Sequence, residues 1–203
     1  QDGEMPTGSE HGDDGASTSS SESLVSLRSE EFPTYFGEHY GRLFHSHGNS
    51  PSAHYYILPV DGHELHRYNA THTLLRRVTG VTCDAPIAEA LADAQERRRT
   101  VVDLCTGTGL WPMELARAFP YAAIRALDRV PIATRYPAPN VRFELADVVA
   151  APLRFADASV DVVHARNTHM TPAAYARLLS EAARVLRPGG LFIAGEWGEY
   201  PAL

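Results

Sequence analysis

The chain has 203 residues, 44% of them hydrophobic, which is enough for one domain with a core of its own. The formal net charge of −7 is carried entirely by residues 1–31, so the neutral remainder offers no basic surface that would favour nucleic acid. All 18 basic residues are arginine, which excludes a Schiff-base lysine and the phosphate-binding lysine of a P-loop.

The apolar runs and the cysteines of the sequence indicate the cellular compartment of the protein. No apolar stretch reaches the roughly 18–20 residues that a membrane span needs, and the polar N-terminus does not resemble a signal peptide. Two cysteines, Cys83 and Cys105, are too few for a disulfide framework and lack metal-ligand spacing. These observations predict no membrane association and a reducing compartment, the cytosol or the nucleus.

The chain before residue 100 divides into a tail and a mixed segment. Residues 1–31 are predicted to be a disordered acidic tail, because they hold too little apolar surface to offset chain entropy. Residues 32–99 begin with aromatics and with histidines that lack partners at ligand spacing, so no metal site is predicted. Apolar spacing then predicts helices over 63–80 and 86–99, with arginines 97–99 at the negative end of the second.

From residue 100 onward, short β-branched runs alternate with helical patterns. Strands are expected over residues 100–105, 122–128, 141–147, 159–165 and 191–197. Helices are expected over 110–119 and 172–186, and residues 187–190, Arg-Pro-Gly-Gly, are expected to break the second helix. This alternation predicts a Rossmann-like, doubly wound α/β domain whose parallel sheet is covered on both faces.

The loop "DLCTGTGLW", residues 103–111, follows the first of these strands, where α/β sheets bind ligands. A dinucleotide fingerprint needs a third glycine where Pro112 stands, and Asp103 would repel a diphosphate. A nicotinamide-dependent oxidoreductase is therefore disfavoured. A ligand with an ammonium group and no phosphate, such as S-adenosylmethionine, removes the conflict, and Gly107 and Gly109 would let the backbone approach it.

Charged residues end the following strands. Asp128 ends the second strand, close to where an acidic residue takes ribose hydroxyls. Asp147 and Val148 end the third and could receive an adenine amino group. Arg166 ends the fourth and could pair with the cofactor carboxylate or with Asp128. Each has an ordinary alternative as a helix cap or a solvated turn, and their joint order carries the interpretation.

At these residues the chain resembles the class I S-adenosylmethionine-dependent methyltransferases over about residues 60–200. The motifs are "VVDLCTGTGLW", "ALD", "ELAD", "FADASVDVVHAR" and "VLRPGGLF". The resemblance implies S-adenosylmethionine as the cofactor. Together with the strand-end residues it assigns these cofactor-binding residues: Asp103, Cys105, Thr106, Gly107, Gly109, Asp128, Arg129, Asp147, Val148 and Arg166.

The earlier stretch "YYILPVDGHELHRYNATHTLL" is similar to the segment before the domain in fungal LaeA-like regulators. That similarity implies that Arg67 and His72 lie on a helix covering the cofactor, and it adds Arg67 to the predicted cofactor-binding residues. Two features depart from the family. Cys105 replaces its usual first glycine, and residues 100–203 end just past the fifth strand, where the family adds two further strands and much of its acceptor pocket. We expect either a fragment or a fifth strand covered by the N-terminal segments.

The function predicted is methyl transfer from S-adenosylmethionine to an unidentified small-molecule or protein acceptor. The alternative is a regulatory or degenerate module that binds the cofactor without turnover. No catalytic residue is assigned: His169 and Glu196 are candidate general bases by position, but a loop histidine and a capping or solvated acid are favoured. His164 is expected in the core, and Trp111 is expected to pack the loop against the sheet.

Overall fold

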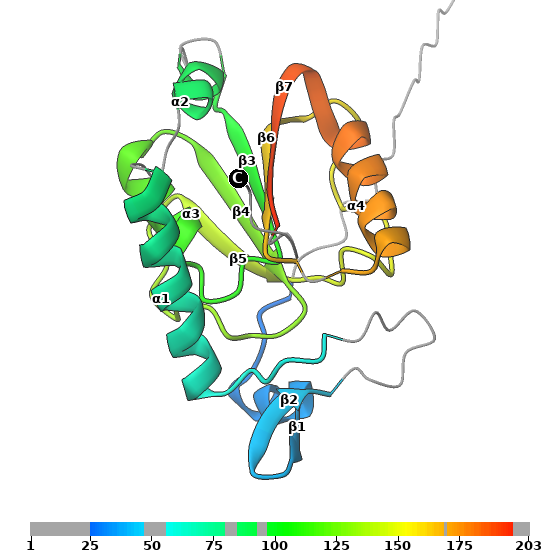
Figure 1. The fold of residues 1–203 in the computed structure, drawn as a ribbon. Coiled ribbons are helices and arrows are strands. Elements are labelled where there is room, and N and C mark those ends of the chain that lie inside the picture. Colours follow the sequence, from blue (N-terminus) through cyan, green and yellow to red (C-terminus); the bar gives the residue numbers. More distant parts are fainter. Residues whose placement is uncertain (1–24, 47–55, 80–84, 93–96, 169, 197–203) are drawn as a thin grey trace, which may run out of the picture.

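The computed structural model describes residues 25–46, 56–79, 85–92, 97–168 and 170–196. Its centre is a parallel five-stranded sheet with strand order β5-β4-β3-β6-β7 (Figure 1). The strands are β3 (Thr100–Leu104), β4 (Ala123–Asp128), β5 (Val141–Leu145), β6 (Val160–Arg166) and β7 (Leu186–Gly195). The strand order reverses between β3 and β6, which confirms the predicted doubly wound architecture and places the switch point at the carboxyl end of β3.

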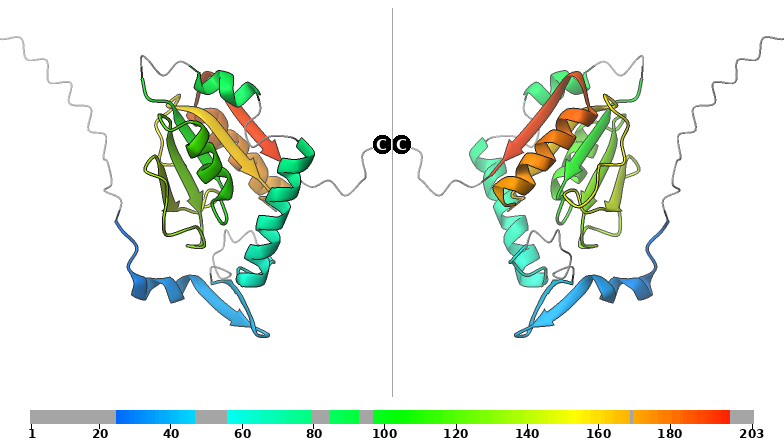
Figure 2. Two further views of the ribbon diagram at one scale, coloured as in Figure 1. Left: turned by 90° about the vertical axis from the view of Figure 1, so that its left-hand side faces the viewer. Right: turned by 90° about the vertical axis from the view of Figure 1, so that its right-hand side faces the viewer.

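Helices cover both faces of this sheet. The helices α1 (Gly62–Thr79), α2 (Ala85–Leu91) and α3 (Leu110–Ala118) lie on one side, and α4 (Pro172–Val185) lies on the other (Figures 1 and 2). Neighbouring residues of one strand serve opposite cores, because side chains alternate along a strand. Val101 packs with the α2 and α3 side and Val102 with the α4 side, and both are fully buried.

The second N-terminal helix is shorter than predicted. It ends at Leu91, and Arg97 and Arg99 lie in the connection to β3 rather than at a helix terminus. Both arginines form ion pairs with the buried Asp161 of β6. Arg97 Nη1 donates to Oδ2 of Asp161 at 2.7 Å, and the backbone N–H of Thr100 donates to the same oxygen at 2.8 Å. The interpretation of these arginines as helix-end charges was wrong, because a buried carboxylate about 60 residues away is their partner.

The predicted helix break at residues 187–190 is a bulge inside β7. Pairing with β6 shifts register there, from Val160–Leu186 to Val162–Leu191. Gly189 has a φ of +77°, and a Cβ on Gly190 would lie 2.9 Å from the Arg187 carbonyl oxygen. The two glycines therefore accommodate the bulge, and β7 can begin directly after the end of α4.

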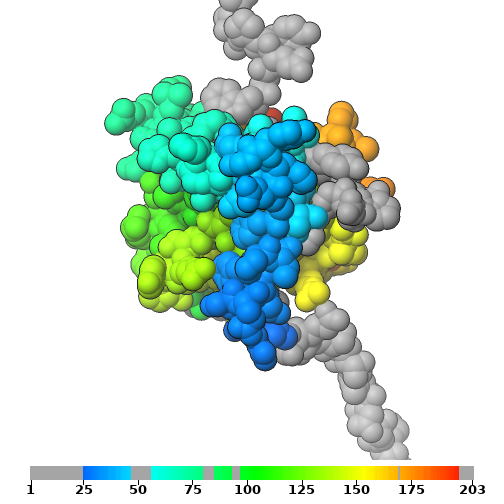
Figure 3. Space-filling view, turned by 90° about the horizontal axis from the view of Figure 1, so that it is seen from below, coloured from blue at the N-terminus to red at the C-terminus, as the bar shows by residue number. Residues whose placement is uncertain are grey.

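The N-terminal segment lies beneath the carboxyl ends of the strands. It comprises a 3₁₀-helix, η1 (Ser29–Tyr35), and an antiparallel hairpin of β1 (Phe36–His39) and β2 (Arg42–His45). Figure 3 shows this segment across the face of the molecule seen from below. Arg42 of β2 pairs with Asp61, whose Oδ1 also accepts the Glu64 N–H at the start of α1. In the described part of the chain β7 pairs with β6 alone, and the hairpin does not run along it (Figure 2).

Candidate functional site

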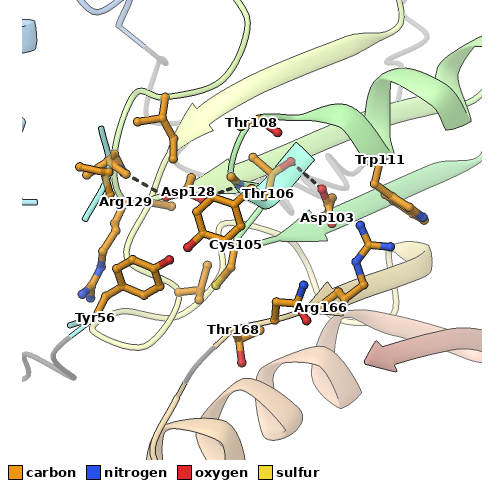
Figure 4. Close-up of a pocket in the computed structure, with 18 of the residues that line it drawn as sticks. Tyr56, Asp103, Cys105, Thr106, Thr108, Trp111, Asp128, Arg129, Arg166 and Thr168 are labelled. Atoms are coloured by element: carbon orange, nitrogen blue, oxygen red, sulfur yellow. Dashed lines mark hydrogen bonds between the residues drawn. The ribbon is translucent and has the colours of Figure 1, made fainter. Parts of the chain in front are cut away.

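A cavity opens where the β3 loop meets the carboxyl ends of β4 and β6 (Figure 4). Nine of the predicted cofactor residues line it, namely Asp103, Cys105, Thr106, Gly107, Asp128, Arg129, Asp147, Val148 and Arg166. The volume open to the centre of a water molecule is about 130 Å³. The sequence therefore located one shared cavity from residues spread over more than 60 positions.

The loop after β3 takes left-handed backbone conformations. Cys105 has a φ of +57°, Gly107 of +59° and Gly109 of +80°. A Cβ on Gly107 would meet no atom within 4 Å, so open space lies over this residue, as a close ligand approach requires. Cys105 adopts a conformation that suits the glycine usual in the family, and its small, partly buried side chain packs against the core.

Gly109 does not line the cavity, contrary to the role predicted for it. A Cβ there would lie 2.5 Å from Cζ of Phe143 on β5, and the residue is the N-cap of α3. Its absent side chain lets α3 pack closely on the sheet rather than letting a ligand approach. Pro112, in the place of a third dinucleotide glycine, is buried in the first turn of α3.

Asp103 is held by protein groups on both carboxylate oxygens. Oδ1 lies 2.6 Å from Nδ1 of His164 on β6. Oδ2 accepts the Thr106 hydroxyl at 2.5 Å, the bond drawn in Figure 4. The indole of Trp111 stacks on the His164 ring at 3.7 Å between centroids and 6° between planes. Asp103 is only 2% exposed, so this geometry favours a supporting role under the loop, and its predicted contact with a cofactor ammonium stays a prediction.

Asp128 connects the acidic end of β4 to the glycine loop. Its Oδ2 accepts the Gly107 N–H at 2.8 Å, and its Oδ1 accepts the Val130 N–H at 3.2 Å. Burial raises the pKa of Asp128, and these backbone N–H groups act against that rise. Tyr68 of α1 lines the same cavity, and its pKa is raised by burial and by the charge of Asp128.

The predicted adenine region is organised by an ion pair. Arg129 pairs with Oδ2 of Asp147, while Oδ1 of Asp147 accepts the N–H groups of Val149 and Ala150 at 3.0 and 3.1 Å. Arg129 and these N–H groups lower the pKa of Asp147, although burial raises it. Val148 is buried against the α4-side core and lines the cavity.

Helix α1 closes the opposite side of the cavity. Asn69 accepts the Thr108 hydroxyl at 2.8 Å, and Nδ1 of His72 accepts from Arg166 Nη2 at 2.7 Å. Arg166 therefore contacts α1 and not Asp128, the partner considered from the sequence. Arg67 does not line the cavity: it pairs with Glu64 and lies over the ring of Tyr68.

Arg166 has guanidinium donors that are available to a ligand in the cavity. Among the described residues it makes no hydrogen bond to a carboxylate, and burial lowers its pKa while Asp103 and Glu114 oppose that shift. A half-buried guanidinium whose neutral partner is a histidine has donors left for an anionic group.

The structure describes one of the two candidate bases. The backbone N–H and the hydroxyl of Thr168 donate to Glu196 Oε1 at 2.9 and 2.6 Å, so this carboxylate links the chain after β6 to the end of β7. His169 lies outside the described residues. Within the described ranges, no group of three or more histidine, cysteine or acidic side chains could hold a metal ion.

Several lining residues were not predicted as site residues. His45 of β2, Tyr56, Val60 and Tyr68 all come from the N-terminal segment and α1. Their aromatic-rich sequence was visible, but its docking under the strands depends on contacts such as the Val60 N–H to the Leu43 carbonyl at 2.7 Å. His164 was expected in the core and is buried there, yet it also lines the cavity.

The buried contacts of His72 predict a pH-dependent stability. Burial and the Arg166 charge lower the pKa of His72 below 6.5, although Glu114 Oε2 lies 3.2 Å from Nε2. The unfolded chain then binds more protons as the pH falls through 6.5, so the free energy of unfolding should decrease by at most about 1.4 kcal/mol per pH unit. Urea denaturation at pH 7.5, 6.5 and 5.5 should show a steeper decrease in the unmodified protein than in His72→Gln. Parallel curves for the two proteins would contradict this assignment.

Comparison with known proteins agrees with this geometry. A family model described as a methyltransferase domain matches residues 101–190. The chain is 36% identical over 155 residues to the secondary metabolism regulator laeA of Coprinopsis cinerea, an alignment covering 76% of this chain and 37% of that protein. It is 34% identical over 138 residues to a demethylmenaquinone methyltransferase of Deinococcus radiodurans, covering 62% of this chain and 55% of that protein.

Among solved structures, S-adenosylmethionine-bound CalS10, an amino pentose methyltransferase from Micromonospora echinaspora, aligns with 56% of this chain and 49% of its own. That alignment has 23% identity and a TM-score of 0.44. The chain thus spans about half or less of the length of the curated relatives named here.

With the sheet order, the glycine loop and the domain match together, the chain belongs to the class I S-adenosylmethionine-dependent methyltransferase family. Within that class its similarity to the laeA protein of Coprinopsis cinerea places it in the LaeA-like group. No helix among the described residues is long and apolar enough to cross a membrane.

Proposed function

We propose that the chain binds S-adenosylmethionine in the cavity at the carboxyl ends of β3, β4 and β6 and transfers its methyl group. The main support for this proposal is that Asp128 and Gly107 both line this cavity and are joined by a 2.8 Å hydrogen bond. A strand-end carboxylate beside an open glycine loop suits a ribose and an amino-acid chain, and no lysine is present for a phosphate.

The shape and the polar groups of the cavity support binding of this cofactor. Open space over Gly107 allows backbone contact, and Asp128 can accept hydroxyl groups of the ribose. The Arg166 guanidinium, which lacks a carboxylate partner among the described residues, would hold the cofactor carboxylate. The Arg129–Asp147 pair and Val148 would border the adenine.

The cofactor supplies an electrophilic methyl group on a sulfonium, and the protein contributes mainly position. Transfer to a nucleophile is an in-line displacement, so a rigid cavity can supply most of the rate enhancement by orientation. Helix α1 and the N-terminal segment would exclude water, since Tyr68, Val60 and Tyr56 line the cavity from that side. We propose either a small molecule or a protein as the acceptor, and the cytosol or the nucleus as the location.

Calorimetric titration tests the binding step. S-Adenosylmethionine and S-adenosylhomocysteine should both bind, whereas NAD should give no heat of binding at the same concentrations, because a pyrophosphate has neither a lysine nor a third loop glycine to receive it. Binding of NAD in preference to S-adenosylhomocysteine would overturn the proposal.

A second measurement separates an enzyme from a binding module. Protein supplied with methyl-labelled S-adenosylmethionine and a cell extract should label an extract component, and a protein sample without extract serves as the background. Cofactor binding without labelling of any acceptor would favour a regulatory module.

A further inference from the structure

A second cavity adjoins the first one on the side of the sheet that α1 and α2 cover. Its volume open to the centre of a water molecule is about 280 Å³. Leu75 of α1, Ile87 of α2 and Ile193 of β7 provide apolar walls. The two cavities share five lining residues: His72, Trp111, His164, Arg166 and Asn167.

At this shared boundary lies the Asp103–His164 pair. An ionised carboxylate only accepts hydrogen bonds, so the 2.6 Å contact to Asp103 Oδ1 assigns the ring hydrogen of neutral His164 to Nδ1. Nε2 then carries a lone pair. It makes no hydrogen bond among the described residues, and the buried His164 side chain lines both cavities.

The His164 ring is held from three directions. Asp103 fixes its edge, the Trp111 indole covers one face, and β6 fixes its backbone through pairing with β3 and β7. A carboxylate beneath the ring also stabilises the imidazolium that forms when Nε2 takes a proton. An imidazole held in one tautomer and orientation is ready to act as a base.

We propose that His164 accepts the proton of a phenolic methyl acceptor bound in the second cavity, and that Asp103 is its positioning residue. This inference rests on the proposed methyl transfer. The acceptor oxygen bonds to the methyl carbon, and the carbon–sulfur bond breaks with its electron pair staying on sulfur, which leaves S-adenosylhomocysteine. The hydroxyl proton moves to Nε2 of His164 and is later released to water.

The lining of the second cavity has both an apolar part and a polar part, which suits an acceptor with an apolar body and a hydroxyl group. Leu75, Ile87 and Ile193 suit an apolar body, while His164 and Arg166 stand at the end that borders the cofactor cavity. A phenol, with an ordinary pKa near 10 as in tyrosine, gives a proton to imidazole more readily than an aliphatic alcohol does. The charged and titratable groups that line the second cavity with His164 are His72 and Arg76 of α1, Arg166 of β6 and Glu196, and Asp103 of β3 contacts the ring of His164.

The first test reads the ring directly and needs no turnover. Protein with ¹⁵N-labelled histidine and saturating S-adenosylhomocysteine should show the neutral His164 ring protonated at Nδ1, and added phenol should shift the Nε2 signal and the Ile193 methyl signal. A proton on Nε2, or no response of both signals to millimolar phenol, would overturn the inference. Failure of S-adenosylhomocysteine to bind would instead overturn the proposed function.

The second test measures transfer from methyl-labelled S-adenosylmethionine to phenol, with anisole as the product. His164→Gln should lower kcat/KM by about 100-fold or more, with S-adenosylhomocysteine affinity within threefold of the unmodified protein. Asp103→Asn, which keeps the side-chain shape, should give a similar loss by favouring the other tautomer. His66→Gln, on an exposed position of α1, is the matched control. Equal rates in His164→Gln and His66→Gln, or no anisole from the unmodified protein, would overturn the inference.

Discussion

Replacing Gly109 with alanine should lower the free energy of unfolding by about 3 kcal/mol. The substitution forces a Cβ into a left-handed residue with a φ of +80°, which costs about 1–2 kcal/mol. The same Cβ would lie 2.5 Å from Phe143 Cζ, and such overpacking costs about 1–3 kcal/mol more. Urea denaturation followed by tryptophan fluorescence measures the change.

Gly107→Ala is the matched control for this prediction. Gly107 is also left-handed, with a φ of +59°, but a Cβ there meets nothing within 4 Å. It should therefore lose only about 1 kcal/mol of stability. Because Gly107 lines the cavity and Gly109 does not, Gly107→Ala should weaken S-adenosylhomocysteine binding more. Equal losses of stability in the two variants would show that contact with Phe143 does not determine the requirement for glycine.

Asp128→Asn should weaken S-adenosylhomocysteine binding by roughly tenfold to a hundredfold. The proposed contacts of the carboxylate with ribose hydroxyls are charge-assisted, and each typically contributes about 1.5–3 kcal/mol. The fold should tolerate the change. Burial already raises the pKa of Asp128, which means that the charged form is costly in the folded protein, and an amide oxygen can still accept the Gly107 N–H.

Calorimetric titration of Asp128→Asn against Glu89→Gln tests this expectation. Glu89 is exposed on α2, away from the cavity lining, so its neutralisation makes the same change in net charge. An affinity for S-adenosylhomocysteine that is the same in both variants would mean that the cofactor site has been placed wrongly. A large loss of stability in Asp128→Asn alone would instead show that the carboxylate mainly supports the loop.

Cys105 shows how the family pattern can change without losing the loop. The residue replaces a glycine and takes a φ of +57°, a conformation that favours glycine. Its side chain packs against the α4-side core, and burial raises the pKa of its thiol well above the ordinary value. The thiol therefore stays protonated and behaves as a small apolar group in the floor of the cavity.

The sequence by itself determined the alternation of strands and helices, the strand that carries the glycine loop, and the acidic residues at the strand ends. These features follow from local periodicity and from turn chemistry, both of which act over a few neighbouring residues. Because the carboxyl ends of parallel strands meet at one edge, strand-end residues such as Asp103, Asp128 and Arg166 could be placed in one cavity without coordinates.

Only the tertiary structure decided which groups these residues contact. Asp103 meets His164 because β3 and β6 pair in a register that sets these two residues side by side. A side chain at Gly109 would clash with Phe143 of β5, and Arg97 donates to Asp161 of β6. The residues in each of these contacts are too far apart in the sequence for a local pattern to predict the contact. Strand order and register determine such contacts, and both depend on how the two cores pack over the whole chain.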